Sequence, residues 1–107
     1  MTHDDYVLTL WEAVMLVTQR KGNSKLRYEV EDLFDTSADI ISIRKVMFRM
    51  MFYEGMIPAD IGRRFNMPRQ KVGYMMNSAE DIKEVQLKHK LELEIEAIQE
   101  RNTKMLM

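Results

Sequence analysis

Residues 58–77 read PADIGRRFNMPRQKVGYMMN, and their spacing is that of two short helices joined by a tight turn. Ile61 and Phe65 are four residues apart, which places both on the inner face of a first helix. Asn66 stands at the turn, where asparagine is the best substitute for glycine in a left-handed conformation. Pro68 suits the first turn of a second helix, because its missing N–H has no partner there. The stretch therefore predicts a helix, a turn and a second helix.

The second helix of this pair has a side to bury and a side to expose. Val72 and Met75, three residues apart, are expected to be buried, Met67 is expected to fill the corner, and Gly62 falls where the first helix must approach the second closely. Arginine, glutamine and asparagine match base edges in the major groove, tyrosine reaches phosphate, and glycine lets the backbone come near a duplex. The spacing thus predicts a helix-turn-helix over 58–77 whose base contacts are Arg69, Gln70, Gly73, Tyr74 and Asn77.

The charge of the chain is concentrated in its middle. Residues 44–76 hold seven lysines and arginines against two carboxylates, whereas residues 1–43 and 77–107 are both acidic and the whole chain has a net charge of −1. A basic segment between acidic flanks indicates a surface for a polyanion, and the phosphate backbone is the common one. The expected phosphate contacts are Arg44, Lys45, Arg63, Arg64 and Lys71.

The rest of the 107 residues predicts further helices, because prolines and glycines are few and apolar residues recur at three- and four-residue steps. A first helix begins near Asp4 or Asp5, a short second covers Leu26–Phe34, and a third covers Asp39–Tyr53 and stops at Gly55. The third is expected to turn Arg44, Lys45 and Arg49 outward. We therefore expect one all-α domain.

A long C-terminal helix is predicted over residues 78–101, which contain no proline or glycine. Ser78 and Asp81 have the spacing of a capping box at its start, and Ile82 and Val85 are expected to pack on the helix-turn-helix. Farther along, a stripe resembles a short coiled-coil seam and predicts a homodimer through Leu91, Ile95 and Ile98. The alternative is that this stripe folds back onto the first helix of the same chain.

Several classes of protein are disfavoured. The absence of cysteine removes disulfides and thiolate chemistry, the longest apolar stretch is too short for a membrane span, and Asp4 and Asp5 stand where a signal peptide carries cations, which favours the cytoplasm. His3 and His89 lie at opposite ends of the chain, so neither indicates catalysis or a metal site. We expect no enzyme activity, no metal and no cofactor.

Three runs of residues resemble the C-terminal origin-binding domain of the bacterial DnaA replication initiators. They are Arg44-Lys45-Val46-Met47-Phe48, Ile61-Gly62-Arg63-Arg64-Phe65, and the pair Val72 and Ile82, within a likeness that covers about residues 25–98. The resemblance implies a helix-turn-helix that binds duplex DNA. Of the family's recognition-helix signature, Arg-Asp-His-Thr-Thr-Val, this sequence keeps the arginine as Arg69. It has one residue fewer than the family between Phe65 and the valine, Val72. It has no Gly-rich ATPase loop, so the resemblance is to a free-standing DNA-binding domain.

The sequence therefore predicts sequence-specific binding of double-stranded DNA, in transcriptional regulation or as a replication accessory protein. The alternative is a helical protein–protein adaptor that uses its acidic faces and its C-terminal helix and does not bind DNA. Binding to duplex that weakens with salt distinguishes the two.

Overall fold

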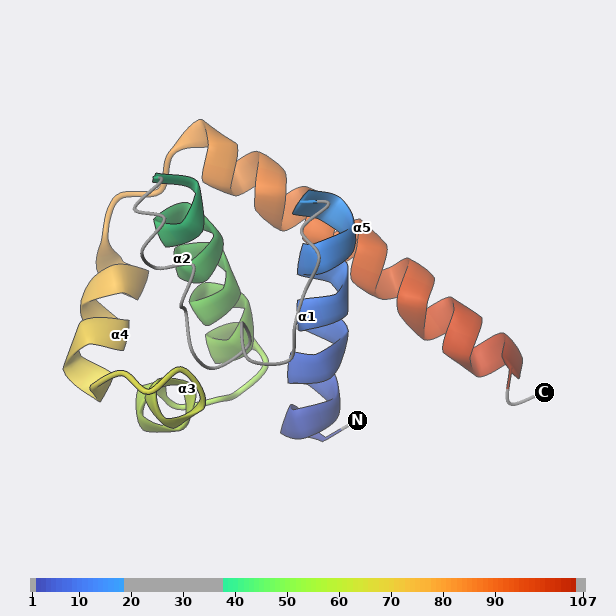
Figure 1. The fold of residues 1–107 in the computed structure, drawn as a ribbon, viewed down its shortest axis with the longest axis horizontal. Helices are drawn as coiled ribbons and strands as arrows, with labels where there is room; N and C mark the ends of the chain where they lie inside the picture. Colours follow the sequence, from blue (N-terminus) through green and yellow to red (C-terminus); the bar gives the residue numbers. More distant parts are fainter. Residues whose placement is uncertain (1, 19–37, 106–107) are drawn as a thin grey trace.

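The computed structural model describes residues 2–18 and 38–105, which form five helices (Figure 1). The helices are α1 (His3–Thr18), α2 (Ala38–Tyr53), α3 (Pro58–Arg64), α4 (Arg69–Asn77) and α5 (Ile82–Met105). No strand occurs in these two ranges, and the predicted all-α class is confirmed. The helix predicted over Leu26–Phe34 lies outside the described residues. No helix within the described ranges has the length and apolar character needed to span a membrane.

The α2 helix is the centre of the fold. It packs against the other four helices, with α3 and α4 on one side of it and α1 and α5 on the other (Figure 1). Its Phe48 ring meets Phe65, which follows α3, edge to face with the ring centroids 5.0 Å apart. The buried side chains of all five helices form one hydrophobic cluster, in which Met47, Met51 and Met56 are completely enclosed. These flexible methionine side chains fill the space between the helices of the core.

The stripe that predicts a coiled-coil dimer is buried within the chain itself. Leu91, Ile95 and Ile98 belong to the core cluster together with Val7 and Leu10 of α1, and α1 packs along α5 (Figure 1). The stripe is covered by α1, which is the alternative that the sequence left open. A homodimer through these three side chains would require α1 to leave, so they are not free to form such a seam.

The end of α2 is set by Gly55. The backbone of Gly55 has φ 97°, in the left-handed region that a side chain disfavours. Its N–H donates to the Phe52 carbonyl at 3.0 Å, and the Met56 N–H donates to the Met51 carbonyl at 3.1 Å. This pair of bonds is a Schellman motif, and both methionines are buried at its apolar contact. The predicted stop at Gly55 is confirmed.

The start of α5 differs from the prediction. Asp81 precedes the helix and accepts the Glu84 N–H at 2.8 Å, while the Glu84 carboxylate accepts the Asp81 N–H at 2.9 Å. This reciprocal pair is a capping box, so the expected box of Ser78 with Asp81 is wrong. The Ser78 hydroxyl instead donates to the Met75 carbonyl at 2.6 Å and ends α4. Ser78 and Asp81 have the spacing of a capping box, but Asp81 and Glu84 have the same spacing, and they are the pair that forms the box.

Candidate nucleic-acid interface

The α4 helix has one buried side and one exposed side. Val72 is completely buried, and the positions opposite it at 3.6 residues per turn are Gln70, Tyr74 and Asn77, all of which are exposed. The Tyr74 side chain is 79% exposed. Beside them, a Cβ placed on Gly73 would meet no atom within 4 Å, so the surface there is open. In Figure 1, α4 lies at the edge of the molecule, away from α1 and α5.

We call the three exposed side chains opposite Val72, namely Gln70, Tyr74 and Asn77, the crown of α4. Two cations flank the crown. Arg69 and Lys71 are exposed on opposite edges of α4, and neither forms an ion pair with any residue that the structure describes. The helix contains no acidic residue to neutralise them. The five predicted base-contact residues therefore share one helix, although Arg69 lies at its edge with Lys71 and not at the crown. We call the exposed side of Arg69–Asn77 the α4 face.

The turn that positions α4 uses three backbone features. The Asn66 residue has φ 52°, the left-handed conformation that the sequence predicts. The Met67 N–H donates to the Gly62 carbonyl at 2.8 Å and closes the end of α3. A Cβ on Gly62 would overlap the Met67 carbonyl oxygen, so the predicted close approach is confirmed. Pro68 directly precedes α4 as its N-cap, one position before the first turn in which it is predicted.

The left-handed turn makes Asn66 a direct test of this geometry. Replacing Asn66 by glycine is expected to leave the free energy of unfolding unchanged or to raise it, because glycine adopts positive φ without a steric penalty. Replacing Asn66 by valine is expected to lower it by about 2 kcal/mol, since a β-branched side chain is disfavoured there. Urea unfolding of the two variants measures the difference. Equal stabilities would contradict the left-handed turn.

A buried carboxylate holds the far end of α4 to the rest of the fold. The Glu84 side chain is fully buried, with Lys45 Nζ 2.7 Å from its Oε1 and Arg49 Nη1 3.6 Å from its Oε2. The Arg49 guanidinium also donates to the carbonyls of Met76 at 3.0 Å and Ser78 at 2.7 Å. Arg49 thus binds the C-terminal carbonyls of α4, where the helix dipole favours a cation. We call Lys45, Arg49 and Glu84 the anchor cluster.

The cations of the anchor cluster also shift the ionisation of its carboxylate. Burial raises the pKa of Glu84, but the hydrogen bonds from Lys45 and from the Asp81 N–H, with the charges of Lys45 and Arg49, outweigh burial. The pKa of Glu84 therefore lies below its ordinary value of 4.5. The carboxylate is charged at neutral pH and both cations are committed to it.

The predicted outward orientation of the three α2 cations is wrong. Arg44 is buried, and burial lowers the pKa of its guanidinium to about 10. Lys45 and Arg49 are mostly enclosed and point to Glu84. The reason is non-local, because the carboxylate that attracts Lys45 and Arg49 arrives from α5, far along the chain. Arg44 and Lys45, predicted to contact phosphate, do not belong to the α4 face.

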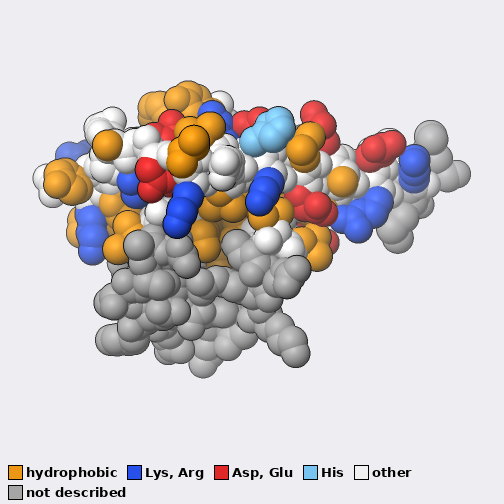
Figure 2. Space-filling model, turned by 90° about the horizontal axis from the view of Figure 1, so that it is seen from above, with side chains coloured by type: hydrophobic (Ala, Val, Ile, Leu, Met, Phe, Trp, Pro, Cys, Tyr) orange, Lys and Arg blue, Asp and Glu red, His pale blue; other side chains and the backbone are white. Residues whose placement is uncertain are grey.

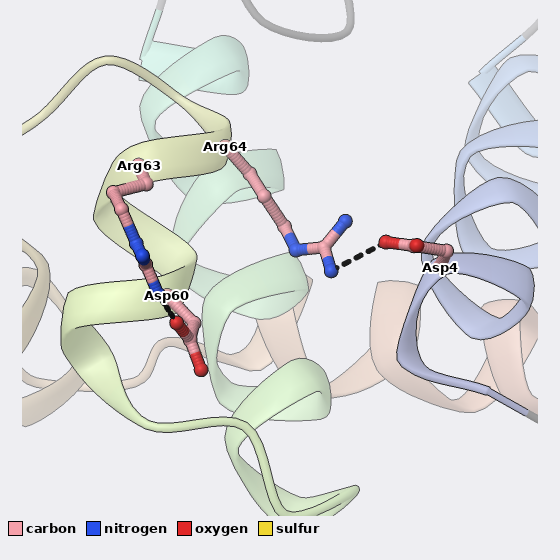
Figure 3. A pocket seen from close by; sticks show the side chains of 4 residues that line it. All are labelled: Asp4, Asp60, Arg63 and Arg64. Carbon is pink, nitrogen blue, oxygen red and sulfur yellow. Dashed lines mark ion pairs between the residues drawn. The ribbon is translucent and has the colours of Figure 1, made fainter.

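The two arginines at the end of α3 form ion pairs of different kinds (Figure 3). Arg64 extends from α3 to Asp4 of α1, with Nη2 2.6 Å from Oδ1, and is mostly enclosed. Arg63 is exposed and pairs with Asp60 one turn earlier on the same helix. An exposed pair of this kind is weak, so Arg63 is available to an anion, whereas Arg64 links α3 to α1. Among the predicted phosphate contacts, only Arg63 and Lys71 are thus exposed.

A shallow groove runs beside the α4 face. It lies between α4 and the end of α2, with the exposed rings of Phe52 and Tyr53 on one side and Gly73 and Asn77 on the other. Over the described ranges, no group of three histidine or acidic side chains has the geometry to hold a metal ion. The carboxylate of Glu80 also lines the groove, so the exposed surface around α4 combines cations, amides and aromatic rings with an acidic side chain.

Comparison of the chain with protein-family models, curated proteins and solved structures finds no match. The likeness to DnaA initiators therefore stands on the residues quoted above alone. Within the site, the alternation of buried and exposed positions over residues 58–77 is a local feature that the spacing of the sequence predicts. The anchor cluster had no signal in the sequence apart from the spacing of Asp81 and Glu84.

Proposed function

We propose that this chain binds double-stranded DNA through α3, the turn at Asn66 and α4. The observation that supports this most directly is the α4 face, which carries two cations without ion pairs to described residues, three exposed polar side chains at its crown and no carboxylate. A helix of this kind fits the major groove, where amides and arginines pair with base edges.

The proposal divides the contacts by their place on the helix. Gln70 and Asn77 at the crown would read bases, because their amides donate and accept at once. Arg69 and Lys71 at the edges, with Arg63 on α3, would bind phosphates on either side of the groove. Tyr74, between the two amides, would reach the backbone or a base. The resemblance to the DnaA initiators supports a role in replication or transcription control.

The first test is the salt dependence of binding to duplex. Wild-type protein is expected to bind labelled duplex at low salt, with log affinity falling linearly against log salt concentration. The substitution Lys71→Ala is expected to weaken binding to all duplexes and to reduce that slope by about 0.9, since one phosphate contact is lost.

The substitution Gln70→Ala is expected to relax preference at one base pair of a sequence selected from random duplex. Fluorescence anisotropy measures all three.

The matched control is Lys104→Ala, which removes an exposed lysine from the distal end of α5. It is expected to leave the affinity and the slope nearly unchanged. No binding by the wild type at low salt would refute DNA binding and leave the protein–protein adaptor. Equal losses for Lys71→Ala and Lys104→Ala would show that general charge, and not the α4 face, drives the interaction.

A further inference from the structure

A hollow in the surface lies between α3 and the start of α1 (Figure 3). It is lined by two arginines, Arg63 and Arg64, and by two carboxylates, Asp4 and Asp60. The opposite charges pair with one another, Arg64 with Asp4 and Arg63 with Asp60, so the four charges cancel. We call these four residues the α1–α3 hollow.

The α1–α3 hollow continues into the proposed DNA interface at Arg63. A second hollow, over the turn between α3 and α4, has Gly62, Asn66 and Arg69 in its lining, and Arg63 borders both hollows. Arg63 therefore lies between Arg69 of the α4 face and Arg64 of the α1–α3 hollow. A DNA strand that binds Arg69 and Arg63 through its phosphates would next reach Arg64.

The side of the molecule away from α3 has a different distribution of charge. In Figure 1, α5 crosses the top of the molecule, whereas α3 and the start of α1 lie at the bottom. Figure 2, seen from above, shows lysines and carboxylates intermixed along the molecule, with hydrophobic side chains exposed among them. On α5, Ile82 is 74% exposed and Val85 is 50% exposed, so the prediction that they pack on the helix-turn-helix is wrong. Charges of both signs do not favour an anion, so a nucleic acid is expected on the side of α3 and α4.

The ion pair between Arg64 and Asp4 joins a mostly enclosed cation to a mostly exposed anion. Arg64 Nη2 is 2.6 Å from Asp4 Oδ1, and the two side chains are 21% and 76% exposed. A pair with so exposed a partner is weak, because the carboxylate is well solvated without the arginine. Asp4 also lies in the first turn of α1, where the helix dipole favours a carboxylate. Asp4 can therefore release Arg64 at little cost.

We propose that the α1–α3 hollow is a further phosphate site of the DNA interface, in which Asp4 occupies Arg64 while the protein is free. The inference rests on the proposed function of α3 and α4 and extends their interface to α1. A carboxylate and a phosphodiester both offer anionic oxygens to a guanidinium, so a phosphate can take the place of Asp4. Because the ion pair must break first, Asp4 lowers the affinity for DNA.

Neutralising Asp4 tests the site. The substitution Asp4→Asn is expected to raise the affinity for labelled duplex on the order of tenfold at about 50 mM salt, since one more phosphate contact forms. The slope of log affinity against log salt concentration should steepen by about 0.9 for the same reason. The substitution Asp4→Ser, which keeps a side chain suited to the start of a helix, is expected to give the same gain. Fluorescence anisotropy measures the affinities.

The matched control is Asp5→Asn. Asp5 is the next residue of α1, is exposed, and forms no ion pair with any residue that the structure describes. The control removes the same charge from the same turn and is expected to leave the slope nearly unchanged. Circular dichroism is expected to show the same helix content in all of these variants.

A double variant tests whether the gain depends on Arg64. In the wild type, Arg64→Gln is expected to change the affinity little, because Asp4 already occupies the guanidinium. In the presence of Arg64→Gln, the substitution Asp4→Asn is expected to lose its gain in affinity and in slope. An equal gain with and without Arg64 would overturn the proposal, because the charge of Asp4 would then act without the arginine.

The outcomes separate this inference from the proposed function. A wild type that binds duplex, with Asp4→Asn no different from Asp5→Asn in affinity and slope, would overturn the site at the α1–α3 hollow and leave the α4 face as the interface. No binding of duplex by the wild type or by any variant would refute DNA binding itself, and this site with it.

Discussion

The substitution Gly62→Ala is expected to lower the free energy of unfolding by about 3 kcal/mol. The added Cβ would overlap the Met67 carbonyl oxygen and lie 3.4 Å from the Met67 carbonyl carbon and 3.5 Å from the Arg69 nitrogen. All three are backbone atoms, so no side-chain rotation relieves the overlap, and α3 and α4 must move apart. Urea unfolding followed by circular dichroism measures the loss.

The control for this prediction is Gly73→Ala in the middle of α4. A Cβ at Gly73 meets no atom within 4 Å, and alanine is the better helix former, so the free energy of unfolding should rise by about 0.5–1 kcal/mol. The two changes add the same methyl group and differ only in its surroundings. A neutral Gly62→Ala would contradict the close approach of α3 and the turn.

The substitution Glu84→Gln is expected to lower the free energy of unfolding by about 2–4 kcal/mol at neutral pH. Glutamine keeps the shape of the side chain but removes the charge that compensates two mostly enclosed cations, Lys45 and Arg49. Losing one partner of a buried ion pair is costly because the remaining charges stay out of water. The matched control is Glu92→Gln, an exposed carboxylate of α5 paired with Lys88, whose loss should cost less than about 1 kcal/mol.

The depressed pKa of Glu84 gives this effect a pH dependence of known sign. A carboxyl whose pKa is lower in the folded state contributes stability above its unfolded value, near 4.5, and this contribution disappears as pH falls through the folded pKa. The difference in stability between wild type and Glu84→Gln should therefore be largest near neutral pH and shrink below pH 4.5. A difference that is constant from neutral to acidic pH would contradict the ionised carboxylate.

The anchor cluster also connects stability with the proposed function. Arg49 links Glu84 of α5 to the last carbonyls of α4, so the orientation of α4 depends on a carboxylate that lies outside the α4 face. Three of the seven cations that make residues 44–76 basic are buried or bound in the interior, and Arg64 is bound to Asp4. A net charge summed over a segment therefore overstates the charge that a ligand meets.

The sequence by itself determined the features that depend on nearby residues. The helix pair over 58–77, the left-handed Asn66, the close approach at Gly62 and the stop at Gly55 follow from one-residue backbone preferences and from side-chain spacing at 3.6 residues per turn. These forces act within a few residues, so the local sequence contains them.

Only the tertiary structure decided which side chains meet across the chain. A stripe such as Leu91, Ile95 and Ile98 shows that an apolar surface must cover it, but its spacing does not say which one, and in the structure α1 covers it. Likewise a lysine or arginine on a helix is outward or inward according to whether a carboxylate from elsewhere comes within reach, as Glu84 does for Lys45 and Arg49. The hydrophobic effect is non-directional, so it does not specify which apolar surface covers a stripe, and an ion pair forms only between groups a few ångströms apart. The arrangement of the helices in space therefore decides both the cover of the stripe and the partners of the cations.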